Sequence, residues 1–162
     1  MKILLTGGKS AVALKLLKAF TKYKVVLADY GEVPSFATKD YELISLGIKN
    51  EDILAHTLLN NCLNEGVDAI LPIHSFEIEA LAKAEVLFNE FNISLLLPSA
   101  LELNKYFIAN QGNKTEHWVI YSKGDLIFSS KDDKLVEELG KNESLNGAFY
   151  VNPNNQFNLI TI

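Results

Sequence analysis

Short apolar runs alternate with segments of helical periodicity over the first two-thirds of the chain. The runs predict strands at residues 2–5, 24–28, 69–73 and 93–97, with a further short strand at 41–46. Between them, apolar residues recur every three or four positions and predict helices at residues 10–22, 51–65 and 75–92. Strands that are apolar throughout are typical of a parallel sheet covered on both faces. We therefore predict an α/β fold with a doubly wound, mostly parallel sheet.

The last third of the chain has a different pattern. Two apolar segments, 117–121 and 126–128, flank a turn sequence at residues 122–125. A short helix is predicted at residues 132–139, stopped near Gly140, and the apolar segments 148–151 and 157–162 flank a second turn. We predict two parts: an α/β domain over residues 1–112 and a small α+β appendage with antiparallel strands over residues 113–162.

Charge restricts what the chain can bind. All fifteen basic residues are lysine, and the net charge is −5. Residues 1–50 carry eight lysines and four acids, whereas residues 51–162 carry seven lysines and sixteen acids. Because arginine is the usual bidentate partner of phosphate and carboxylate, an anion site here needs lysine, backbone N–H groups or a helix N-terminus. An acidic chain without arginine is not expected to bind nucleic acid.

Cysteine usage and hydropathy predict a cytoplasmic protein. Cys62 is the one cysteine and can form no internal disulfide, which fits a reducing compartment. The chain has no run of about 18 apolar residues, and its apolar start is too short for a secretory signal, so no membrane partner is expected. The three histidines lack metal-ligand spacing, so no metal site is expected.

A glycine turn follows the first predicted strand and is the first candidate binding element. Gly7, Gly8, Lys9 and Ser10 lie where backbone N–H groups and a helix N-terminus could face an anion. The segment matches neither the P-loop nor the dinucleotide fingerprint, because the spaced glycines of both motifs are missing. Asp29 ends the second strand, near the position of a ribose-binding acid. The alternative is that the glycines only make a tight turn.

A second group of candidates follows the strand at residues 69–73. His74 and Ser75 come directly after it, and Glu77 falls in the first turn of the next helix. Ligands of open α/β sheets bind at the carboxyl ends of the strands, so these three side chains are candidate ligand contacts. The alternatives are a surface loop for His74 and a helix N-cap for Ser75.

The order and spacing of several segments resemble the N-terminal, Rossmann-like pre-ATP-grasp domain of carbamoyl-phosphate-synthase-like ATP-grasp ligases. Residues 3–14, with Thr6-Gly7-Gly8-Lys9-Ser10-Ala11-Val12-Ala13-Leu14, resemble the T-G-A-R-A-P-V-A-L type segment that opens that domain. The similarity continues, in order, through Val25-Val26-Leu27-Ala28-Asp29, Pro34-Ser35-Phe36-Ala37, Asp68-Ala69-Ile70-Leu71-Pro72, Glu77-Ile78-Glu79-Ala80-Leu81-Ala82 and Leu95-Leu96-Leu97-Pro98-Ser99, and covers about residues 1–110.

The resemblance implies a role without catalysis by this chain alone. Complete members bind ATP and magnesium between two later subdomains, and their pre-ATP-grasp domain supplies one wall of the substrate site and a dimer surface. The resemblance also implies Ser35 and Lys105 as candidate ligand contacts. Asn104-Lys105 lies at the place of a D-K pair whose lysine can reach the nucleotide in complete members. The appendage resembles a stump of the small subdomain, with Asn152 at the position of an ATP-contacting lysine. We therefore expect no catalytic residues and no cofactor, and ATP and magnesium only where a partner supplies the ATP-grasp domain.

Three functions remain open on the sequence. The leading hypothesis is a stand-alone pre-ATP-grasp-like domain, not an enzyme by itself, that binds a small anionic metabolite or pairs with a separate ATP-grasp subunit, and that forms a homodimer. The alternatives are an NAD(P)-type Rossmann module, supported by Asp29 but not by the glycine spacing, and a structural or regulatory protein without a ligand. Filled space at the carboxyl edge of the sheet would favour the last of these.

Overall fold

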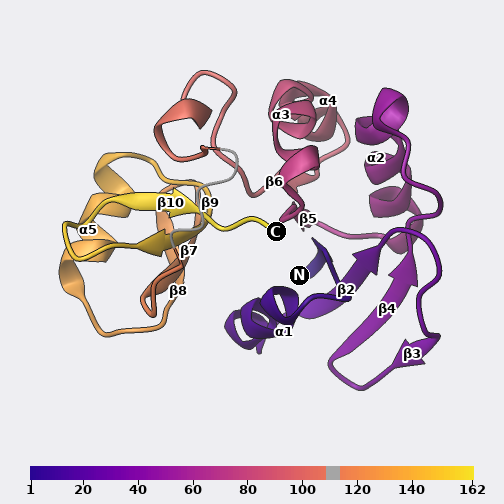
Figure 1. The fold of residues 1–162 in the computed structure, drawn as a ribbon, viewed down its shortest axis with the longest axis horizontal. Coiled ribbons are helices and arrows are strands. Elements are labelled where there is room, and N and C mark those ends of the chain that lie inside the picture. The colour runs from indigo at the N-terminus through magenta and orange to yellow at the C-terminus, as the bar shows by residue number, and fades with distance from the viewer. Residues whose placement is uncertain (109–113) are drawn as a thin grey trace.

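Two β-sheets lie side by side in the structure, a computed structural model that describes residues 1–108 and 114–162 (Figure 1). The larger sheet has the strand order β3-β4-β2-β1-β5-β6. Every pairing in it is parallel except that of β3 with β4. Its strands are β1 (Lys2–Thr6), β2 (Lys24–Asp29), β3 (Phe36–Ala37), β4 (Tyr41–Ser45), β5 (Ala69–Leu71) and β6 (Ser94–Leu95).

Helices cover both faces of this sheet, which confirms the predicted doubly wound α/β class. Alternate residues of β1 point to opposite faces: Leu5 packs with α1, while Leu4 packs with α2 and α3. The helices are α1 (Ala11–Leu17), continued by the 3-10 turn η1 (Lys18–Phe20), α2 (Leu54–Glu65), preceded by η2 (Glu51–Ile53), α3 (Ser75–Lys83), α4 (Glu85–Glu90) and the 3-10 turn η3 (Leu103–Lys105). In the part of the chain described, no helix is long and apolar enough to cross a membrane.

The second sheet is antiparallel, as predicted for the last third of the chain. Its strand order is β10-β9-β7-β8, which leaves β8 at one edge. The strands are β7 (Trp118–Ser122), β8 (Asp125–Ser129), β9 (Gly147–Val151) and β10 (Phe157–Leu159), and helix α5 (Lys134–Asn142) packs beside them. The Asn146 side-chain amide donates to the carbonyls of Leu95 and Leu97, which joins this sheet to the end of β6.

The two sheets share their apolar cores. One cluster of buried residues joins Leu4 and Ile70 to Val119 and Phe149, and the other joins Ile3 and Leu71 to side chains of the antiparallel sheet. The antiparallel sheet therefore packs directly on the parallel sheet through shared apolar clusters. The predicted boundary between residues 112 and 113 lies outside the described residues.

Several element bounds differ from the sequence predictions. The helix predicted at residues 75–92 is two helices, because Ala84 leaves the helical region at φ −96° and ψ 10°. The short strand β3 lies in a segment for which no strand was predicted. Gly140 lies inside α5 instead of ending it. A Cβ at Gly140 would lie 2.1 Å from Tyr121 Cε1, so this glycine allows α5 to pack closely on the sheet.

Candidate functional site

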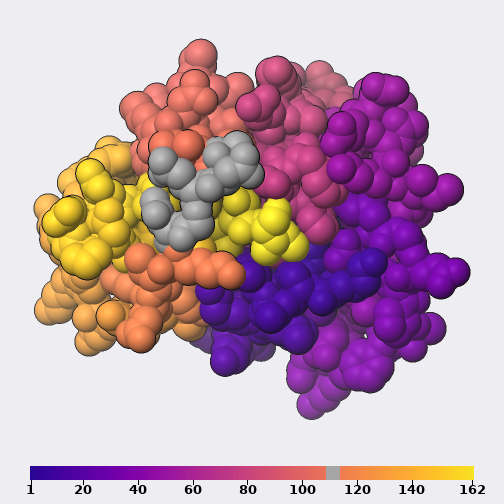
Figure 2. Space-filling view, in the orientation of Figure 1, coloured from indigo at the N-terminus to yellow at the C-terminus, as the bar shows by residue number. Residues whose placement is uncertain are grey.

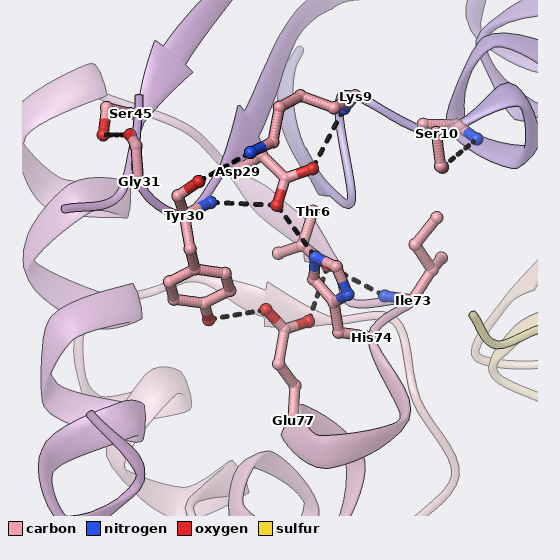
Figure 3. A network of polar contacts seen from close by, with 11 residues as sticks. Thr6, Lys9, Ser10, Asp29, Tyr30, Gly31, Ser45, Ile73, His74 and Glu77 are labelled. Atoms are coloured by element: carbon pink, nitrogen blue, oxygen red, sulfur yellow. Dashed lines mark hydrogen bonds and ion pairs between the residues drawn. The ribbon is translucent and has the colours of Figure 1, made fainter. Parts of the chain in front are cut away.

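The carboxyl ends of β1, β2 and β5 meet at one edge of the parallel sheet and carry a network of polar contacts (Figure 3). Strands β1 and β5 are neighbours, yet α1 follows β1 on one face and α3 belongs to the cluster on the other. This is a topological switch point, where open α/β sheets bind their ligands. The network is therefore the candidate site that the fold itself indicates.

Asp29 is the centre of the first half of the network. Its carboxylate accepts hydrogen bonds from the N–H groups of Lys9, at 3.0 Å, and Tyr30, at 2.9 Å, and His74 Nε2 lies 2.9 Å from Oδ1. The residue is only 5% exposed. Burial alone raises the pKa of Asp29, but the hydrogen bonds from Lys9, His74 and Tyr30 outweigh it and hold the pKa below its ordinary value. Asp29 is therefore a charged carboxylate with three polar contacts inside the protein.

Glu77 is the centre of the second half and is completely buried. The hydroxyls of Thr6 and Tyr30 each donate to its carboxylate at 2.6 Å. Thr6 Oγ1 in turn accepts the N–H of Ile73 at 2.8 Å, which ties the ends of β1 and β5 together. Burial raises the pKa of Glu77, against the lowering effect of the Thr6 and Tyr30 hydrogen bonds. The two acids of the site thus have opposite pKa shifts.

The glycine turn uses its backbone N–H groups within the protein. Gly8 donates to Ala28 O at 3.0 Å, Lys9 to Asp29, and Ser10 to Gly7 O at 2.8 Å. The Ser10 hydroxyl accepts from Ala13 N and caps α1. Asp29 therefore takes the place at the Lys9 N–H that the sequence suggested for a bound anion.

The segment after β10 lies over the same turn. Ile162 N–H donates to Ile73 O at 2.8 Å, and Ser75 N–H donates to Ile162 O at 3.0 Å. Gly7 has a φ of +68°, and a Cβ there would lie 2.7 Å from Ile162 Cδ1 and 2.8 Å from Ile73 Cγ1. In Figure 2 the yellow end of the chain rests at the meeting point of the indigo and magenta segments. The space above Gly7 is thus occupied by side chains of this chain.

His74 turns toward Asp29 instead of capping its helix. It holds the N-cap position of α3 but makes no capping bond with its side chain, and Ser75, the expected cap, is the first helical residue. Its ring stacks on Phe76, with centroids 4.8 Å apart, and lies 5.6 Å from the ring of Tyr30. Within residues 1–108 and 114–162, no hydroxyl is hydrogen-bonded to this ring. The pair can orient an imidazole and its proton, but the described contacts supply no nucleophile.

Two candidate residues lie outside this network. Ser35 is exposed in the loop before β3. Lys105 is exposed in η3 and forms an ion pair with Glu102. Asn152, at the position suggested for an ATP-contacting lysine, accepts hydrogen bonds from the N–H groups of Asn154 and Gln156, each at 2.9 Å, and so organises the β9–β10 turn.

Sequence reasoning missed three members of the site. Thr6 and Tyr30 stand next to predicted site residues, at the ends of β1 and β2, and their place at the carboxyl edge was the available signal. Ile162 carried no such signal, because it reaches the edge from the far end of the chain. In the described part of the chain, no group of three or more histidine, cysteine, aspartate or glutamate residues could hold a metal ion.

Comparison with known proteins shows the fold. No protein-family model matches the sequence, and a search of the curated proteins finds no match. Among solved structures, the urea amidolyase of K. lactis aligns with 97% of this chain and 13% of its own, at a TM-score of 0.53 and 13% identity. The biotin carboxylase subunit of a pyruvate carboxylase aligns with 64% of this chain and 24% of its own, at a TM-score of 0.44 and 22% identity. This chain thus spans a small part of either protein.

The likeness to the urea amidolyase extends over both sheets, since it covers nearly the whole chain. It confirms, at the level of the fold, the resemblance to the pre-ATP-grasp domain of carbamoyl-phosphate-synthase-like ATP-grasp ligases that the sequence indicated. The class that the fold defines is an α/β domain with a mostly parallel sheet and a closely packed antiparallel unit, similar in structure to the aligned part of the urea amidolyase.

Proposed function

We propose that this chain is a non-catalytic pre-ATP-grasp-like module that pairs with a separate chain carrying an ATP-grasp catalytic domain. The observation that carries the proposal is that the buried polar groups at the carboxyl edge form their hydrogen bonds within this chain. Asp29 and Glu77 receive their hydrogen bonds from this chain, and Ile162 covers Gly7. Because these buried polar groups already have partners, none of them needs a ligand. Filled space at this edge favours a protein without a ligand there, so we assign the edge a role in contact with another protein.

The loop after β4 offers an apolar contact on the same edge. Ile48 is 90% exposed, and the neighbouring backbone is tied to the site, because Gly31 donates to Gly47 O at 2.8 Å and Leu46 donates to Asp29 O at 2.8 Å. Lys49 Nζ lies 3.8 Å from the centre of the Phe76 ring, which itself stacks on His74. Ile48 is thus an exposed apolar side chain held beside the polar network, as a protein contact requires.

Affinity capture from the native cells, followed by mass spectrometry, tests the pairing. We expect a captured chain with ATP-grasp catalytic sequence, whose carboxylate-dependent ATP turnover rises when this chain is added. Ile48→Asp should weaken the pairing at least ten-fold, since it places a charge in a desolvated contact. Val86→Asp is the control: Val86 is 71% exposed but belongs to α4, which leads to the opposite end of the sheet. Capture without an ATP-grasp chain, or equal effects of both variants, would contradict the proposal.

A small anion bound at Lys9 is a second candidate, and one observation favours it. Lys9 is exposed at the carboxyl edge, its ammonium group donates to Tyr30 O at 2.8 Å, and its backbone N–H shares the Asp29 carboxylate with His74. Without arginine, this lysine suits a carboxylate or monophosphate better than a triphosphate or a dinucleotide. We expect acetate or phosphate to shift the NMR signals of Lys9 and His74. Lys9→Ala should abolish those shifts, whereas Lys39→Ala, at another exposed lysine, should preserve them.

NMR titrations with NAD and Mg-ATP separate the remaining alternatives. Chemical-shift changes at Gly8 and Asp29 with NAD would favour a dinucleotide module, and a response to Mg-ATP by the chain alone would remove the need for a partner to hold the nucleotide. If no ligand shifts the NMR signals and no partner chain is captured, a structural or regulatory role is favoured. Self-association, which the resemblance implies, is tested by sedimentation at micromolar concentration, where a dimer is expected.

A further inference from the structure

The opposite, amino edge of the parallel sheet contains a hollow of about 570 Å³. It lies where β1, β5 and β6 begin, between the turn η1 and the edge strand β8 of the antiparallel sheet. This volume is within the range of small-molecule sites, which are roughly 300–1,000 Å³. The hollow is separate from the Asp29–His74 network, because it is built from the other ends of the same strands.

The floor of the hollow is apolar and buried. Ile3, Ala69 and Leu96 line it and are each at most 2% exposed. Phe128, on β8, forms part of the wall and is half-buried. An aliphatic chain that enters the hollow leaves water for an apolar lining, and the burial of its own apolar groups lowers the free energy.

The rim of the hollow carries positive charge. Lys18 and Lys22 line the hollow and are exposed, and neither takes part in an ion pair or a side-chain hydrogen bond recorded among the described residues. Lys15, one turn before Lys18, differs, because its ammonium group donates to the Tyr150 hydroxyl at 2.9 Å. Asp125 is the acid of the rim, so the two lysines leave a net positive charge there.

We propose that this hollow binds a small amphipathic monocarboxylate, with its aliphatic chain on the Ile3–Leu96 floor and its carboxylate at Lys18 and Lys22. The apolar floor selects a chain, and the lysines select an anionic head over a neutral or cationic one. The site is independent of the proposed pairing at the carboxyl edge.

Trp118 provides a direct reporter of occupancy. It is the one tryptophan in the sequence, and its ring stacks on Phe128 with centroids 4.5 Å apart. A chain that enters the hollow contacts Phe128 and so changes the surroundings of the indole. Octanoate has no aromatic ring of its own, so its titration gives a clean fluorescence signal.

The experiment titrates the folded chain with octanoate, octanamide and octylamine. We expect octanoate to change the fluorescence of Trp118 and the methyl NMR signals of Ile3 and Leu96, and to bind at least five-fold more tightly than the amide or the amine. In the series butanoate, hexanoate, octanoate, each added CH₂ should tighten binding up to about four-fold. Signals from Asp29 and His74 should stay in place.

The double variant Lys18→Met with Lys22→Met should weaken octanoate binding about five-fold, as expected for two partly solvated charge contacts. Its matched control is Lys83→Met with Lys134→Met, which removes the same charge at two exposed lysines on α3 and α5. Equal binding of octanoate and octanamide, or equal effects of the two double variants, would overturn the role of the lysines. An absent response of Trp118, Ile3 and Leu96 to octanoate would overturn the site.

Discussion

The two edges of the parallel sheet are built from the same strands but treat their polar groups in opposite ways. At the carboxyl edge, Asp29 and Glu77 are buried and hydrogen-bonded to their own chain. At the amino edge, Lys18 and Lys22 lie around an apolar hollow and make no ion pair with the described residues. Buried polar groups must find partners during folding, whereas solvated ones need none. The polar groups of the carboxyl edge therefore stabilise the fold, whereas the lysines of the amino edge are available to bind a ligand.

The largest expected effect comes from removing the buried acid of the carboxyl edge. Glu77→Ala takes away two hydrogen bonds, leaves the hydroxyls of Thr6 and Tyr30 without an acceptor, and opens a cavity. We expect the free energy of unfolding to fall by about 3–5 kcal/mol. Urea denaturation followed by circular dichroism measures this change. If the carboxyl edge were not held together from within, the loss would be far smaller.

Glu79→Ala is the matched control for that measurement. Glu79 belongs to the same helix, α3, but is exposed. Its removal should change the free energy of unfolding by less than about 0.5 kcal/mol. Similar losses for both variants would mean that the helix, and not the network, accounts for the effect.

A second prediction concerns the closure of the glycine turn. Gly7→Ala imposes a side chain at positive φ and pushes it against Ile162 and Ile73, so we expect a loss of about 2–4 kcal/mol. Gly66 also has positive φ, at +62°, but a Cβ there meets nothing within 4 Å. Gly66→Ala should therefore show only the backbone part, about 1 kcal/mol. Equal losses in thermal unfolding would show that Ile162 does not cover the turn in solution.

The sequence indicates the network's location better than its contacts. Apolar strands alternating with helices predict a parallel sheet, and a parallel sheet brings the ends of its strands to one edge, where Asp29, His74 and Glu77 do lie together. Periodicity does not specify which distant side chain fills a space, so the Tyr30–Glu77 bond and the return of Ile162 to Gly7 were not predicted. The break at Ala84 was missed for a related reason, because no glycine or proline marks it.

A third prediction uses pH to test how Asp29 is held. Its pKa is lower in the folded protein than the ordinary value of 3.8, so its contribution to stability is present above pH 3.8 and is lost as the pH falls through the folded pKa. Asp29→Asn should cost about 1–3 kcal/mol near neutral pH, since it removes hydrogen bonds to a charged acceptor. The gap between the wild-type protein and the variant should close below pH 3.8 in acid-titrated urea denaturation.

Glu77 has the opposite pH dependence, because burial favours its protonated form and raises its pKa. Its contribution to the free energy of unfolding therefore falls as the pH rises above the ordinary value of 4.5. It is present in both proteins and largely cancels in their difference. A gap that stayed constant down to the acid limit would mean that the Asp29 carboxylate carries no special stabilisation.

The smallest predicted effect compares two lysines on the side of the sheet that carries α1. The Lys15 ammonium lies 4.5 Å from the centre of the Tyr150 ring and donates to its hydroxyl, whereas Lys18 has no such partner in the described structure. Lys15→Met should lower the free energy of unfolding by about 0.5–1 kcal/mol, and Lys18→Met should leave it unchanged within about 0.5 kcal/mol. Thermal unfolding without ligand measures both. A clear loss from Lys18→Met would show that this charge already stabilises the folded chain, and would weaken the case that it is available to bind a ligand at the amino edge.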